Sequence, residues 1–121
     1  MQELLFKTDG STIPSLPRSR MTSTARQGDK WLGRAGPGDM LALRVTDGPV
    51  FAKAVCLGVE QTTYSGVIAR ALENHANQMS DIAPDESTAR HNLRSALEAA
   101  YGPDQAPGDT YCIVHFIIIN E

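Results

Sequence analysis

Alternating and continuous apolar segments along the chain predict five β-strands. They are expected over residues 3–6, 22–26, 40–46, 50–59 and 110–119. The third and fourth segments flank the turn Asp47-Gly48-Pro49 and predict a β-hairpin, in which Gly58 is a candidate bulge. Residues 110–119 are highly apolar, which is typical of a strand at the centre of a sheet.

Helical spacing appears between the fourth and fifth strands. Thr63 is a candidate N-cap for a first helix, whose apolar positions recur through residues 67–76. A second helix begins at Asp85 or Ser87 and ends near Tyr101-Gly102. Residues 27–38, with four glycines and one proline, predict a loop. The order β-β-β-β-α-α-β suits a small open or closed β-barrel with helices packed over one end.

The length and net charge of the chain limit the functions that it can have. The 121 residues predict a single domain over 1–121, and the net charge is −3 at pH 7. Non-specific nucleic-acid binders are usually basic, because neutralising phosphates supplies their affinity, so this class is disfavoured. The second helix, residues 85–101, lies in an acidic half of the chain and is a candidate surface for a protein partner. We find no signal peptide and no long apolar run, and expect a soluble, cytoplasmic protein.

One short segment, residues 18–39, is nevertheless basic. It holds five of the 11 basic residues, which are Arg18, Arg20, Arg26, Lys30 and Arg34. Thr22, Thr24 and Arg26 share one face of the predicted strand, so they would project together into a cleft. Arginine pairs with anions and an indole stacks on bases, so Arg20, Lys30 and Trp31 complete a candidate binding site. Trp31 would either stack on a base or plug one end of the barrel.

The remaining reactive residue types give little support for other chemistry. Cys56 and Cys112 lie in apolar runs and are interpreted as reduced core residues. The three histidines, at positions 75, 91 and 115, make no metal-binding pattern, and no metal or cofactor is predicted. No serine stands in a Gly-x-Ser-x-Gly context, so the sequence gives no support for a serine hydrolase.

The run Thr22-Ser23-Thr24-Ala25-Arg26, followed by Lys30-Trp31 and by Gly38-Asp39 before an apolar strand, resembles the ASCH family of the PUA-like superfold. The family's opening motif reads roughly Lys-Thr-x-Thr-x-Arg. Tyr101-Gly102 and the last strand look like the family's ending, so the resemblance covers about residues 3–119. It implies an α+β fold, a small PUA-like β-barrel of about five to six strands with two helices packed over one side.

The resemblance also implies an activity, the hydrolysis of N4-acylated cytidines by a lysine, a threonine and a glutamate. The threonine position falls on Thr24 and the motif arginine on Arg26. The lysine and glutamate positions fall on Met21 and Met79, which carry neither charge nor a transferable proton. Some relatives have a histidine near the last strand, which makes His115 a further candidate ligand contact.

Three hypotheses follow. The first is a module that binds RNA or a modified nucleoside or nucleotide through Arg20, Thr22, Thr24, Arg26, Lys30, Trp31 and His115. The second is an enzyme of the same cleft, an N4-acylcytidine amidohydrolase with substituted catalytic groups around Thr24, or a weak ribonuclease. The third is an interaction protein that docks a partner through the acidic helix 85–101.

Overall fold

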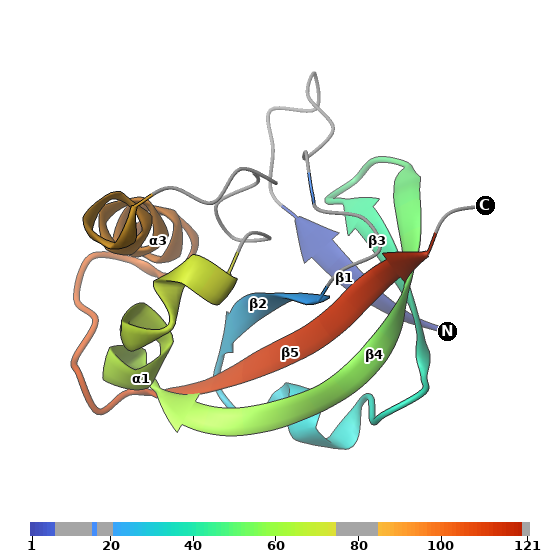
Figure 1. Cartoon of the computed structure of the whole chain (residues 1–121), viewed down its shortest axis with the longest axis horizontal. Coiled ribbons are helices and arrows are strands. Elements are labelled where there is room, and N and C mark those ends of the chain that lie inside the picture. The colour runs from blue at the N-terminus through green and yellow to red at the C-terminus, as the bar shows by residue number, and fades with distance from the viewer. Residues whose placement is uncertain (7–15, 17–20, 75–84, 120–121) are drawn as a thin grey trace.

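Five strands form one strongly curved sheet in the order β1-β3-β4-β5-β2 (Figure 1). The computed structural model describes residues 1–6, 16, 21–74 and 85–119. The strands are β1 (Gln2–Phe6), β2 (Met21–Gln27), β3 (Met40–Val45), β4 (Val50–Thr63) and β5 (Thr110–Ile119). Strand β1 runs parallel to β3, and the other neighbouring pairs are antiparallel.

The predicted hairpin is confirmed, and the last strand is an interior strand of the sheet, although the central strand is β4. Strand β5 lies between β4 and β2, and β4 pairs with β3 across the expected turn. The pairing of β4 with β5 shifts by one residue between Cys56 and Gly58, where the sequence predicts a bulge. Bulges bend and twist strands, and β4 bends strongly along its 14 residues (Figure 1).

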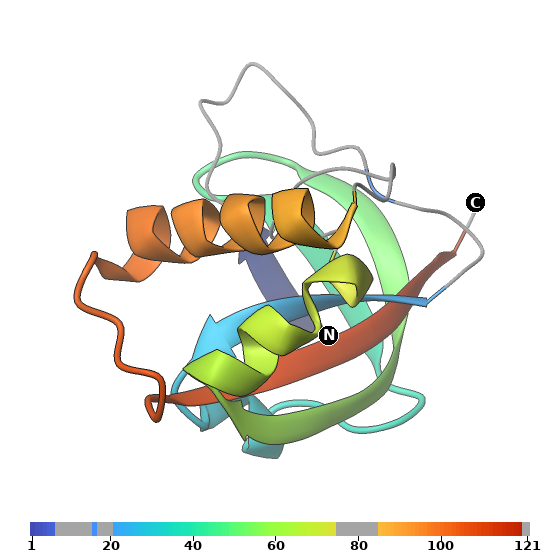
Figure 2. The same ribbon diagram turned by 60° about the vertical axis from the view of Figure 1, so that its left-hand side comes forward.

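The two faces of the sheet carry separate hydrophobic cores. One core joins residues of β1, β3, β4 and β5, so the sheet curls around it, and we call this side the inner face. The other core joins Ala25 and Ile113 of the sheet to residues of the helices, and we call this side the helix face. Figure 2 shows the two α-helices lying side by side over the helix face. The predicted α+β class is therefore confirmed: the described residues form a five-stranded half-barrel with two α-helices on one side.

Helix α1 begins, and helix α3 begins and ends, at residues that the sequence singles out. The helices of the described residues are η1 (Lys30–Gly33), α1 (Tyr64–Ala69), η2 (Ala71–Glu73) and α3 (Glu86–Tyr101). Thr63 caps α1 by accepting from the Gly66 N–H, and Asp85 caps α3 by accepting from the Thr88 N–H. Gly102 ends α3 at a φ of 96°. Within the described ranges, no helix has the length and apolar character needed to cross a membrane.

Two expectations about these segments are wrong in detail. The first helix is shorter than its apolar spacing predicts, because a 3₁₀ turn, η2, follows it after Arg70. The segment expected to be a loop, 27–38, contains the 3₁₀ helix η1, which packs against β4 and β5. Burial of Trp31 in the inner core accounts for this ordering, since one large apolar side chain anchors the glycine-rich segment.

Arg26 connects the two edge strands of the half-barrel. Its side chain leaves β2 on the inner face, and its Nη1 donates a hydrogen bond of 2.6 Å to the carbonyl oxygen of Leu5 in β1. The guanidinium also lies over the Phe6 ring, 5.0 Å from the ring centroid. Burial lowers the pKa of Arg26 from its ordinary value, but arginine stays protonated at neutral pH. One side chain thus links strands that lie at opposite ends of the sheet order.

We expect Arg26→Met to lower the free energy of unfolding by about 1–2 kcal/mol, because a charged hydrogen bond and a cation–π contact are lost while the apolar stem is kept. Urea denaturation followed by circular dichroism measures the change. Arg94→Met, at an exposed position of α3, is the matched control and should change stability by less than about 0.5 kcal/mol. Equal stability of the two variants would show that Arg26 does not hold the edges together.

Candidate functional site

Strand β2 divides the predicted site residues between two faces of the sheet. Thr22, Thr24 and Arg26 stand opposite Phe116, Val114 and Cys112 of β5, which belong to the inner core. The intervening Ser23 stands opposite His115, on the helix face. The structure therefore brings the two threonines and Arg26 together as predicted, but it separates them from His115 by the thickness of the sheet.

The threonines of the inner face are almost wholly enclosed. Thr22 is 1% exposed and Thr24 is 0% exposed. The Oγ1 atom of Thr22 and the Nε atom of Arg26 are buried without a hydrogen-bond partner. Such groups cost free energy unless a ligand or water reaches them, so a ligand contact here stays a prediction.

Trp31 occupies the inner core beneath β4 and β5. It is 7% exposed and belongs to the same cluster as Phe116 and Val114. The guanidinium of Arg34 lies over its ring at 5.5 Å from the centroid. Of the two roles considered for Trp31, the structure favours the plug at one end of the barrel.

The other predicted residues of this segment contribute less. Lys30 is exposed. Arg20 and Met79 lie outside the described residues.

His115 is the centre of a polar group on the helix face. Its Nε2 lies 2.7 Å from Glu60 Oε1 in the neighbouring strand β4. Its side chain is 15% exposed, and its other ring nitrogen, Nδ1, is buried with no hydrogen-bond partner. Since the ionised Glu60 carboxylate only accepts hydrogen bonds, Nε2 carries the proton in the neutral ring, and Nδ1 is left as an acceptor.

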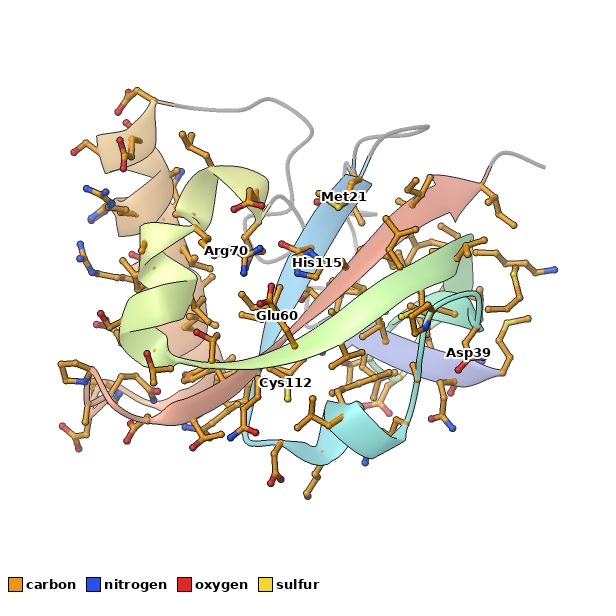
Figure 3. The ribbon with its side chains drawn as sticks, turned by 60° about the horizontal axis from the view of Figure 1, so that its bottom comes forward. Met21, Asp39, Glu60, Arg70, Cys112 and His115 are labelled. Carbon is orange, nitrogen blue, oxygen red and sulfur yellow. The ribbon has the colours of Figure 1, made fainter. Side chains whose placement is uncertain are left out.

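Three more residues complete the group. Arg70, at the end of α1, pairs with Glu60 through Nη1, and its Nε donates to Glu73 Oε2 at 3.1 Å. Ser23 Oγ donates to the carbonyl oxygen of Glu73 at 3.1 Å. Figure 3 shows Glu60, Arg70 and His115 gathered between α1 and the sheet. We call these five residues, Ser23, Glu60, Arg70, Glu73 and His115, the His115 cluster.

The cluster is close to electrically neutral. Its two carboxylates, one guanidinium and one imidazole sum to between −1 and 0, depending on the protonation of His115. Hydrogen bonds from His115, and to a smaller extent from Arg70, hold the pKa of Glu60 below its ordinary value, although burial opposes them. Phosphate recognition needs an excess of positive charge, which these five residues do not provide.

Sequence analysis predicted only His115 of this cluster, because the five residues are distant from one another in the chain. Ser23 and His115 are brought together by strand pairing, and Glu60 and Arg70 join from two further elements. The one available signal was the polar histidine inside an otherwise apolar strand.

The thiols of Cys56 and Cys112 are free and buried in the inner core, as the sequence predicts. Among the described residues, no three metal-ligating side chains converge.

Trp31→Ala should lower the free energy of unfolding by about 3–5 kcal/mol, because it leaves a large cavity in the inner core. Leu32→Ala is the matched control, since Leu32 is its neighbour in η1 and is exposed. That control should change stability by less than about 0.5 kcal/mol. Urea denaturation of both variants tests the plug, and comparable small losses for both would contradict it.

Glu60→Gln should lose stability at neutral pH and lose progressively less in acid. A carboxyl whose pKa is depressed by folding stabilises the protein above its unfolded pKa, and this contribution disappears as the pH falls through the folded pKa. Because Glu60 is partly exposed, we expect a difference of at most about 1 kcal/mol at pH 7, which vanishes once the pH falls below the lowered pKa of Glu60 in the folded protein. Denaturation at several pH values measures it, with Glu98→Gln on α3 as control. A difference that stays constant with pH would argue against the pairing.

Comparison with known proteins supports the fold and leaves the function open. No family model matches the chain, and no match is found among curated proteins. A crystal structure of protein EF3133 from Enterococcus faecalis V583, of family DUF984, superimposes with a TM-score of 0.53 at 13% sequence identity. The match covers 84% of this chain and 62% of that one. At this identity the likeness concerns the fold alone, a small half-barrel consistent with the PUA-like architecture.

Proposed function

We propose that this chain is a nucleoside-binding module of the ASCH kind and that the ligand lies against the His115 cluster. The observation that carries the proposal is the buried Nδ1 of His115, an acceptor that has no donor among the described residues. A buried acceptor without a partner costs about 1–3 kcal/mol. A ligand that donates an N–H or O–H to Nδ1 offsets this cost and so gains affinity and orientation.

The chemistry of the cluster suits a nucleoside. Nucleobases carry hydrogen-bond donors and acceptors at their edges, and ribose adds hydroxyl groups. The cluster offers an acceptor at His115, carboxylate acceptors at Glu60 and Glu73, and guanidinium donors at Arg70. Met21 is 51% exposed and is the first residue of the strand that carries Ser23, so an apolar surface for a base lies nearby.

Electrostatics favours a neutral nucleoside over RNA or a nucleotide. The His115 cluster has no net positive charge, and the whole chain carries −3. A polyanion would depend on the basic segment 18–39, in which Arg26 and Arg34 already contact aromatic rings. In this proposal Thr22, Thr24 and Arg26 hold β2 in place from the inner face, and His115 makes the ligand contact.

The amidohydrolase alternative centred on Thr24 has weaker support. Thr24 is fully buried on the inner face, and the lysine position of the family motif is occupied by Met21. Methionine neither accepts a proton at neutral pH nor stabilises an oxyanion, so it cannot replace the lysine. Binding therefore accounts for the described residues better than hydrolysis at Thr24 does.

Isothermal titration with cytidine, uridine and N4-acetylcytidine tests the proposal. We expect saturable binding of at least one of them, and His115→Phe should weaken it about tenfold by removing the acceptor. His91→Phe, at an exposed position of α3, is the matched control and should bind as the unmodified chain does.

A short RNA oligonucleotide serves as the competing ligand in the same experiment. Nucleoside binding should change little with salt concentration, whereas RNA binding would weaken steeply as salt rises. Salt-sensitive RNA binding without nucleoside binding would overturn the proposal. So would equal nucleoside affinities of His115→Phe and His91→Phe.

A further inference from the structure

We propose that the protonation state of His115 determines which base edge this site accepts: the neutral ring binds a hydrogen-bond donor, and the protonated ring binds an acceptor. This inference rests on the proposed function and adds to the same site a specificity-determining residue that responds to pH. Its basis is the unequal surroundings of the two ring nitrogens of His115.

One ring nitrogen, Nε2, keeps the same partner in both protonation states. It lies 2.7 Å from Glu60 Oε1. An ionised carboxylate only accepts hydrogen bonds, so Nε2 carries a proton in the neutral ring and in the imidazolium alike. Figure 3 shows the two side chains next to each other on the helix face. Because this contact does not depend on the second proton, the ring keeps its orientation when that proton binds.

The other ring nitrogen, Nδ1, changes its role. It is buried and has no hydrogen-bond partner among the described residues. In the neutral ring Nδ1 is an acceptor, and after protonation it is a donor. A ligand of the wrong kind would place two acceptors or two donors against each other and leave a buried polar group unpaired, which weakens binding about tenfold or more.

The charges around the ring nearly cancel, so no single charge fixes its protonation state. Glu60 of β4 favours the imidazolium, whereas Arg70, at the end of α1, pairs with the same carboxylate and opposes this effect. Glu73 of η2 pairs with Arg70 in turn. Strand β2 contributes only the uncharged Ser23, and α3, which packs against α1 and η2, contributes no member of the cluster.

Glu60 keeps its negative charge while a histidine titrates. Hydrogen bonds from His115, and to a smaller extent from Arg70, hold the pKa of Glu60 below its ordinary value, although burial opposes them. Histidine is the side-chain type that ordinarily changes its charge between about pH 5 and 8. A change of pH within this range therefore acts on the imidazole and leaves the carboxylate as its acceptor.

Isothermal titration with cytidine and 3-methyluridine at about pH 8 and about pH 5.5 tests the inference. The two nucleosides are probes: cytidine carries an exocyclic amino group that donates, whereas the base of 3-methyluridine has only acceptors. From the higher to the lower pH, the affinity for cytidine should fall about tenfold and that for 3-methyluridine should rise about tenfold. The matched control His91→Phe, at an exposed position of α3, should show both changes, and His115→Phe should show neither.

A second measurement follows the ring itself. The imidazole signal of His115 is titrated with pH by proton NMR and identified by its absence in His115→Phe. A ligand that binds only the neutral ring lowers the midpoint of this titration, and a ligand that binds only the imidazolium raises it. Saturating cytidine should lower the midpoint and saturating 3-methyluridine should raise it, each by about one pH unit, which corresponds to a tenfold change in affinity. Equal midpoints with the two nucleosides would overturn the inference.

Glu60→Gln tests the positioning role of Glu60. A glutamine amide either accepts from Nε2–H or donates to Nε2, so it no longer fixes the tautomer of the neutral ring. At about pH 8 the ratio of cytidine affinity to 3-methyluridine affinity should fall at least about threefold, through tighter binding of 3-methyluridine, which a loss of structure would not produce. Glu98→Gln, at an exposed position of α3, is the control. An unchanged ratio in Glu60→Gln would contradict the inference.

The outcomes also separate this inference from the proposed function. Nucleoside binding that needs His115 but is the same at both pH values overturns the pH-dependent selectivity and leaves the proposed function standing. Absence of nucleoside binding at both pH values overturns the proposed function, and the inference with it.

Discussion

The antiparallel pairing of β2 with β5 is the constraint on which both the barrel and the His115 cluster depend. It places Thr22, Thr24 and Arg26 over the inner core and Ser23 opposite His115 on the other side. Because strand side chains alternate, a slip of one residue would exchange the two sets. The inner set would then lose the contact of Arg26 with Leu5 in β1, and the helix face would lose its serine.

Local features of the fold could be predicted from the sequence because they depend on neighbours in the chain. Thr63, Asp85 and Gly102 begin or end helices through contacts within a few residues. The hairpin of β3 and β4 follows from two apolar runs around a short turn. The ordering of η1 could not be predicted in this way, since it depends on the burial of Trp31 against distant strands.

The candidate site was predicted only in part, and the reason is the register between strands. Alternation placed Thr22, Thr24 and Arg26 on one face, but it could not tell whether that face was a cleft or the interior. The residues around His115 come from three other elements. No spacing in the sequence predicts that Ser23, Glu60 and Arg70 lie near it. A family motif narrows the choice of residues, yet it conveys nothing about a cluster assembled outside that motif.

The bulge at Gly58 determines which residue of β4 faces His115. Cys56 pairs with Phe116, but Gly58 rather than Leu57 pairs with His115, so one extra residue is accommodated there. Beyond the bulge Glu60 is opposite Ile113 and shares the helix face; without it, Val59 would take that place and Glu60 would turn inward. A sequence alignment that treats this extra residue as an ordinary gap will therefore match Glu60 to side chains on the wrong side of the sheet.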